Sequence, residues 1–145
     1  MVESPVYLDE RIKVSVKTDE WKYEPRILPK HVIPVYIQVE NNTDATLKIR
    51  PEDVYITDAK GNRYKPLDAM QVNESMRQEL AWWYPHFWFV LGDFPDIINR
   101  AFRWGDIPPK TQRLGFVYFP ALPSNVDSAV LHIKEYKFNL KLRKY

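Results

Sequence analysis

Apolar and polar residues alternate in several short stretches of the chain. Ile12, Val14 and Val16 are separated by polar neighbours, and the same period of two recurs over residues 33–40. Because successive side chains of a strand point to opposite faces of a sheet, each stretch predicts a strand with one buried face. Pro34 fits only at the start of its strand, since proline has no N–H to donate to a neighbouring strand.

Turn-forming residues separate these stretches from further short ones. Residues 41–44 and 58–62 are runs of turn formers, and Gly61 is available for a positive φ, so each run predicts a tight connection between two strands. The strand pattern resumes near Gln112 with the apolar run of residues 114–119, and residues 129–133 and 136–142 follow, the last of which alternate. We expect about seven strands, which favours the mainly β class and an immunoglobulin-like antiparallel β-sandwich.

The strand pattern is interrupted between residues 66 and 107, and this insertion predicts two helices. Residues 73–83 contain good helix formers, Asn73 can cap their N-terminal end, and Pro85 follows as a stop. A first helix of about ten residues is therefore expected here.

A second helix is expected to begin near Phe94 and to end before Gly105, a natural C-terminal stop. A carboxylate at its start can cap it, and Pro95 falls in its first turn. Apolar residues at helical spacing share one of its faces, namely Phe94, Ile97, Ile98, Ala101 and Phe102. The second helix is therefore expected to be amphipathic.

The insertion is rich in aromatic residues and holds four of the five tryptophans of the chain. An aromatic side chain removes roughly 150–250 Å² from water when it is buried, so the cluster has the area of a protein–protein interface if the sandwich leaves it uncovered. We predict an interaction surface formed by Trp82, Trp83, Tyr84, Phe87, Trp88, Phe89, Phe94, Ile98, Phe102 and Trp104.

Three arrangements of this insertion are open from the sequence. The helices can fold back on an open end or edge of the sandwich and form a satellite core. They can instead contact a protein partner or a second copy of the chain, because Trp, Tyr, Phe and Arg are enriched at such interfaces. In the third arrangement the aromatic residues insert shallowly at a membrane interface, with Arg100 and Arg103 near anionic lipid.

Length and charge set further bounds. One domain spanning residues 1–145 is expected, since a chain of 145 residues can bury a self-sufficient core. The formal charge of +2 is too small and too dispersed for a dedicated nucleic-acid binder, so no nucleic-acid partner is expected. Basic residues do gather near the C-terminal end, and we interpret them as solvated. They are Lys134, Lys137, Lys141, Arg143 and Lys144.

No catalytic or metal-binding pattern is recognisable, and no cofactor is expected. The chain has no cysteine, and its three histidines, at positions 31, 86 and 132, are too far apart for ligand spacing. The four glycines are scattered, so no phosphate-binding loop is present. The acidic residues at 52, 53 and 58 do not have EF-hand spacing and are interpreted as parts of solvated turns.

The tryptophan cluster also permits a carbohydrate-directed function. Sugars stack on tryptophan, and Trp82, Trp83 and Trp88 have carboxylates in the same insertion that resemble the acid pair of a glycosidase. Those carboxylates are Asp93, Asp96 and Asp106. We expect Asp93 and Asp96 to be charges at the start of a helix, which weakens this interpretation. A lectin-like protein or weak glycosidase is therefore kept as the alternative and not as the main prediction.

Three segments resemble a known kind of domain. They are residues 33–43, residues 51–64 with their Pro-Glu-Asp-Val and Asp-Ala-Lys-Gly-Asn-Arg-Tyr runs, and residues 108–119. Together they are similar to telokin-like, immunoglobulin-like domains of bacterial cell-envelope proteins and lipoproteins, over about half the chain. The resemblance implies a sandwich fold and a cell-envelope setting, and it carries no catalytic residue. The lack of a lipobox cysteine and the aromatic insertion depart from it.

We therefore expect a non-enzymatic binding or assembly module of the cell envelope, with the aromatic insertion as its interaction surface. Residues 1–20 contain no apolar core of a signal peptide, so only the resemblance favours that location.

Overall fold

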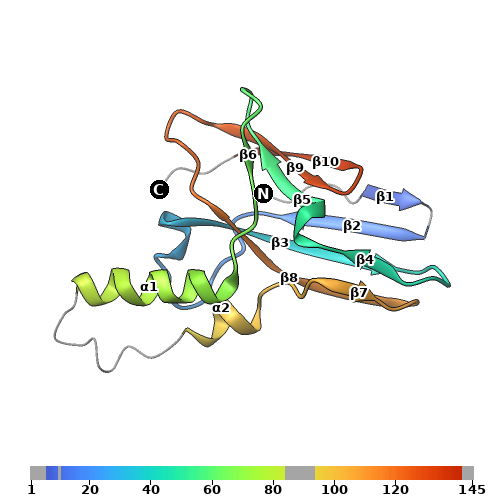
Figure 1. Cartoon of the computed structure of the whole chain (residues 1–145), viewed down its shortest axis with the longest axis horizontal. Coiled ribbons are helices and arrows are strands. Elements are labelled where there is room, and N and C mark those ends of the chain that lie inside the picture. Colours follow the sequence, from blue (N-terminus) through green and yellow to red (C-terminus); the bar gives the residue numbers. More distant parts are fainter. Residues whose placement is uncertain (1–5, 10, 84–93, 142–145) are drawn as a thin grey trace.

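The fold is built on antiparallel sheets, two of which stack face to face (Figure 1). The computed structural model describes residues 6–9, 11–83 and 94–141, with side chains for residues 11–81 and 94–141. The first sheet has the order β1 (Val6–Asp9), β2 (Ile12–Lys17), β3 (Val32–Asn41), β8 (Thr111–Pro120). The second has the order β10 (Tyr136–Lys141), β9 (Ser128–Ile133), β5 (Val54–Thr57), β6 (Arg63–Tyr64).

A third, two-stranded sheet pairs β4 (Leu47–Ile49) with β7 (Gly105–Ile107). Two short 3-10 helices, η1 (Leu28–Lys30) and η2 (Pro51–Asp53), connect strands. The mainly β sandwich expected from the alternation is confirmed. The short strands β1 and β7 were not expected, because neither contains enough alternating residues to give a period.

The sandwich core lies between the two four-stranded sheets and is formed by the apolar positions of the alternating stretches. Val14, Val16, Val35 and Ile37 of the first sheet are fully buried, as are Ile56 and Leu131 of the second. Burial of such side chains is the main favourable term in folding. The alternation therefore identified the inward face of these strands correctly.

Strand β8 is buried on both of its faces. Val117 and Phe119 point into the sandwich core, whereas Phe116 and Tyr118 belong to a second apolar cluster on the outer side of the same sheet. We call this second cluster the outer core, and it comprises Trp21, Leu28, Val32, Val72, Met76, Ile97, Phe116 and Tyr118. A strand that is apolar on both faces needs a covering layer on each.

Helices α1 (Ala69–Trp83) and α2 (Pro95–Asn99) provide the second covering layer (Figure 1). Val72 and Met76 of α1 and Ile97 of α2 are buried in the outer core. The segments that flank the helices bind the free edge of β8: the Leu67 N–H donates to Tyr118 O (2.7 Å) and the Phe102 N–H to Phe116 O (2.9 Å). The described part of the insertion thus packs on both the outer face and the edge of the sheet.

The first helix begins earlier than expected. Asp68 caps it, because its Oδ1 accepts a hydrogen bond from the Met70 N–H at 2.8 Å. The expected cap, Asn73, lies inside the helix and is buried. Its Oδ1 instead accepts the Phe94 N–H at 2.7 Å and ties the start of α2 to α1.

The second helix is shorter than expected and ends at Asn99. Arg100 and Phe102 leave helical geometry because their backbone groups bond to Phe116 in β8. Gly105, expected as the helix stop, instead opens β7 with a φ of 120°. The N-cap residue of α2 is Phe94, whose side chain makes no capping hydrogen bond. Asp93, a candidate for the expected capping carboxylate, lies outside the described residues.

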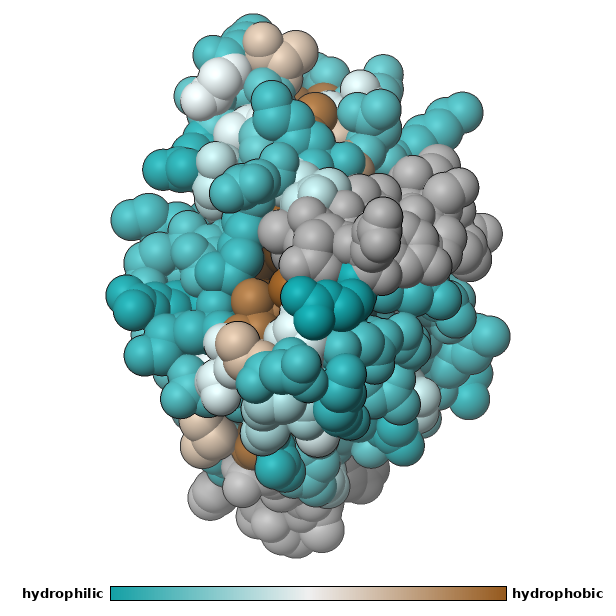
Figure 2. Space-filling view, turned by 90° about the vertical axis from the view of Figure 1, so that its right-hand side faces the viewer, coloured by the Kyte–Doolittle hydropathy of each residue, from teal (hydrophilic) through white to brown (hydrophobic). Residues whose placement is uncertain are grey.

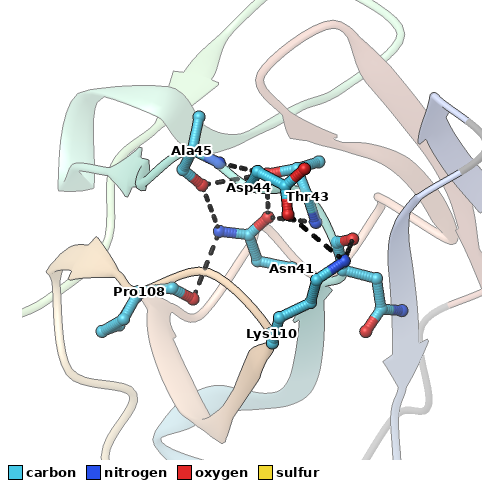
Figure 3. Close-up of polar contacts among 7 residues, drawn as sticks. Asn41, Thr43, Asp44, Ala45, Pro108 and Lys110 are labelled. Atoms are coloured by element: carbon cyan, nitrogen blue, oxygen red, sulfur yellow. Dashed lines mark hydrogen bonds and ion pairs between the residues drawn. The ribbon is translucent and has the colours of Figure 1, made fainter.

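One buried polar residue joins two turns at the end of the sandwich (Figure 3). The Asn41 Nδ2 donates to the carbonyls of Ala45 and Ile107, both at 2.9 Å, and its Oδ1 accepts from the Thr43 hydroxyl at 2.6 Å. Lys110 donates to Asn42 O at 2.8 Å. The turn after β3 and the turn before β8 are therefore held by one side chain and one neighbouring ammonium group.

The substitution Gly115→Ala is expected to destabilise the fold. An added Cβ would lie 2.6 Å from both Cα and N of Phe102, and backbone atoms have little freedom to move away. We expect the free energy of unfolding in urea to fall by about 3 kcal/mol. Leu114→Ala, on the exposed neighbour, serves as control and is expected to cost less than about 1 kcal/mol. Equal stability of Gly115→Ala and wild type would show that this close approach is not required.

The substitution Asn41→Ala is expected to lower the free energy of unfolding by about 2–3 kcal/mol, because buried carbonyls lose their donor. Urea denaturation followed by circular dichroism measures the change. Asn42→Ala is the matched control, since Asn42 is exposed and its backbone carbonyl is retained. Equal losses in the two variants would contradict the assignment.

Candidate functional site

The predicted interaction residues fall in two groups. Trp82 and Trp83 form the end of α1 and have no described side chains. Four further residues lie outside the described residues, namely Tyr84, Phe87, Trp88 and Phe89. For these six residues the predicted surface stays a prediction.

The other four predicted residues have described side chains. Phe102 is buried in the sandwich core, and Phe94 packs partly buried against the outer core. Ile98 is partly exposed on α2. Trp104 is partly exposed and packs edge-on against Phe102, with ring centroids 5.3 Å apart. Their place in a binding surface stays a prediction.

Phe102 and Trp104 both line a groove beside the edge of β8. This groove, which we call the apolar groove, has a volume of about 320 Å³. Its lining residues are Pro51, Pro66, Leu67, Asp68, Ala69, Ala101, Phe102, Trp104, Phe116, Val117 and Tyr118. All of them except Asp68 and Tyr118 lack an ionisable group, so the walls are mainly apolar.

Backbone bonds fix the walls of the apolar groove. Leu67 on one side and Phe102 on the other are each hydrogen-bonded to β8, and Gly115 lets the Phe102 backbone approach the strand closely. The Asp68 carboxylate is held by its role as helix cap. Sequence reasoning missed this groove, because its lining comes from segments whose proximity depends on the pairing with β8.

Little other large apolar surface is exposed among the described side chains. Within residues 11–81 and 94–141, the large hydrophobic residues classed as exposed are Met70, at 57% exposure, and Leu114, at 47%. On the face seen in Figure 2, hydrophilic residues predominate and hydrophobic ones show mainly in a narrow central hollow. The apolar groove is a place among the described residues where apolar side chains line a space that a ligand can enter.

An aromatic cluster on the outer face of the first sheet supports the helices. Trp21 packs edge-on against Phe116 with centroids 5.1 Å apart, and its Nε1 donates to Pro25 O at 3.0 Å. The Tyr118 hydroxyl donates to Ile97 O at 2.8 Å, and burial raises the pKa of Tyr118 strongly. Since these polar groups are satisfied inside the protein, the cluster is structural.

A polar cluster lies on the outer face of the second sheet. The rings of Tyr55 and His132 stack with centroids 4.5 Å apart, and the Arg63 guanidinium lies 3.6 Å from the centre of the Tyr55 ring. The Thr57 hydroxyl and His132 Nε2 are 2.9 Å apart. Partial burial, followed by the charges of Lys137 and Arg63, lowers the pKa of His132. Strand alternation places these residues outward, but their register across the sheet could not be predicted.

Two further observations concern other kinds of site. In the part of the chain that the structure describes, no three or more His, Cys, Asp or Glu residues come together as a group able to hold a metal ion. No helix among the described residues has both the length and the apolar character needed to cross a membrane.

The fold places this protein in the class of mainly β proteins built as an antiparallel β-sandwich. No protein-family model and no curated protein matches the chain. Among solved structures, a secreted protein of Mycobacterium tuberculosis, MPT63, is similar with a TM-score of 0.47 and 11% sequence identity, over 96% of this chain and 92% of that one.

The substitution Lys137→Gln is expected to raise the pKa of His132. Loss of the ammonium charge removes a repulsion that disfavours the imidazolium form. A titration of the imidazole signals by NMR measures the change, with Lys22→Gln on the other side of the sandwich as control. An unchanged pKa of His132 in Lys137→Gln would exclude this coupling.

Proposed function

We propose that the chain is a non-enzymatic binding module whose apolar groove receives an apolar side chain of a protein partner. The observation that carries the proposal is the pairing of Trp104 with Phe102 on the wall of a groove of about 320 Å³. That volume is in the range of ligand-binding pockets, which are mostly apolar with a few polar groups. Asp68 is the carboxylate at this groove.

The rigidity of the groove supports this function. Its walls are bonded to β8 on both sides, so a ligand would not have to order them first. Preformed sites lose less conformational entropy on binding. We also propose, from the sequence alone, that the aromatic residues of 82–94 take part in binding. We also propose, from the motifs alone, a relationship to telokin-like domains of the cell envelope.

The experiment follows the Trp104 indole N–H signal by NMR while N-acetyl-phenylalaninamide is added. We expect saturable shifts for Trp104 and its neighbours in the groove. Ala69→Met, which fills the groove, is expected to weaken binding by about tenfold, because a methionine side chain occupies the space of the ligand. Leu114→Met is the matched control on an exposed position and is expected to leave binding unchanged.

Shifts that spread evenly over the surface, or equal binding by Ala69→Met and wild type, would contradict the groove as the site. The role of residues 82–94 is tested separately by Trp83→Ser combined with Trp88→Ser. Light scattering after size exclusion detects a second copy as the partner, and co-sedimentation with anionic vesicles detects a membrane interface. A wild-type monomer that does not bind vesicles would exclude both of these occupants.

A carbohydrate ligand is the second candidate function. The observation that favours it is that partly exposed Trp104 and the Asp68 carboxylate line the same groove. A glycan array probed with wild type and Trp104→Ala distinguishes the two candidates. Hits that depend on Trp104 support the carbohydrate, whereas an array without hits leaves the protein partner as the proposal.

A further inference from the structure

The outer face of the second sheet carries positive charge without carboxylates on its strands. The strands β5, β6, β9 and β10 contain no aspartate or glutamate, but they contain Arg63, Lys137 and Lys141, all exposed. Alternation points these three side chains away from the core, since their neighbours Tyr64, Phe138 and Leu140 pack inward. The face lies on the side of the sandwich opposite the helices (Figure 1).

The strand register brings the central residues of this face into a row. Lys137 lies opposite His132, and His132 lies opposite Tyr55. Arg63 lies opposite Thr57 and leans over the Tyr55 ring. Lys137 on β10 and Arg63 on β6 therefore flank the Tyr55–His132 stack from either side, three strand spacings or about 14 Å apart.

The carboxylates in the turns next to this face are partly engaged elsewhere. Asp58 accepts hydrogen bonds from its own turn, including the Asn62 N–H at 2.9 Å, and from the Tyr64 hydroxyl at 3.0 Å. Asp53 pairs with Lys134 at 3.4 Å. Asp127 and Glu135 are exposed in the flanking turns. Among the described residues, no ion pair neutralises Arg63 or Lys137 at the face itself.

We infer that this face, which we call the basic face, is a docking surface for an acidic, extended segment of a partner protein. The Arg63 guanidinium lies over the Tyr55 ring, which restrains it, and a positioned planar guanidinium suits bidentate binding of a carboxylate. In an extended peptide, side chains four residues apart lie on the same face and are separated by about 14 Å, so a segment with acidic residues at alternate positions can reach both cations.

The same observations favour an acidic peptide over two other anionic partners, a lipid membrane and a nucleic acid. A membrane-docking face would combine cations with apolar side chains that insert, but the large exposed apolar residues among those described, Met70 and Leu114, lie on other elements. A nucleic acid requires neutralisation of several phosphates together, which three cations on a short sheet supply poorly. The face is also independent of the apolar groove, which lies beside β8.

The histidine gives the docking a dependence on pH. His132 is faced by Tyr55 and Thr57 from β5, by Arg63 from β6 and by Lys137 from β10. A bound carboxylate counteracts the repulsion from the two cations and favours the imidazolium form. Binding is therefore expected to tighten as the pH falls from 7.5 to 5.5, a range in which glutamate remains ionised.

The test uses fluorescence anisotropy with a labelled ten-residue peptide in which glutamate alternates with serine. Wild type is expected to bind it in a salt-dependent manner, and Arg63→Gln combined with Lys137→Gln is expected to weaken binding by about tenfold or more. Lys22→Gln combined with Arg26→Gln removes the same charges from the other side of the sandwich and is expected to keep the affinity within about twofold of wild type. His132→Gln is expected to bind the peptide but to lose the pH dependence.

Three outcomes would overturn the inference. The first is no binding of the acidic peptide by wild type at low salt, and the second is an equal loss of affinity in the control double variant. The third is tighter, Arg63-dependent binding of phosphatidylserine vesicles or of a single-stranded oligonucleotide than of the peptide. Equal urea midpoints for wild type and variants, measured beforehand, show that a lost affinity does not reflect unfolding.

Discussion

The two-sided burial of β8 is the constraint on which the rest of the structure depends. One face of this strand closes the sandwich core through Val117 and Phe119, and the other supports the outer core through Phe116 and Tyr118. Its one edge pairs with β3 over ten residue pairs, and its other edge binds the segments that flank the helices. The helical layer and the apolar groove are therefore both attached to the same backbone.

This constraint explains why the second helix could not be predicted correctly from local pattern. Residues 94–102 have helical spacing of apolar positions, yet the chain leaves the helix after Asn99. The reason is tertiary, because Arg100 and Phe102 satisfy backbone groups of Phe116 that would otherwise remain unpaired. Asn73 shows the same influence of tertiary contacts. Its residue type suits a helix cap, but its side-chain oxygen accepts the Phe94 N–H instead.

The strands were more predictable than the sites, for a physical reason. Alternation along one strand reports which side chains face a core, and Val14, Val35 and Leu131 followed it. A site requires the register between distant strands, as in the pairing of Tyr55 with His132, and no local period reports that. Lys137 illustrates the difference: it is exposed, as expected of a solvated lysine, and only the register of the sheet shows that it lies opposite His132, which lies opposite Tyr55.

The bond between Asn73 and Phe94 has a consequence for how this protein can diversify. The bond holds Phe94, which follows residues 84–93, against α1, which precedes them. The positions on both sides of residues 84–93 are therefore fixed to α1, whatever the sequence between them. Closing a longer loop costs only slightly more entropy, about 0.6 kcal/mol for each doubling of its length. Insertions and exchanges in this segment can thus accumulate without loss of the scaffold, which makes it a natural position for grafting a new recognition sequence.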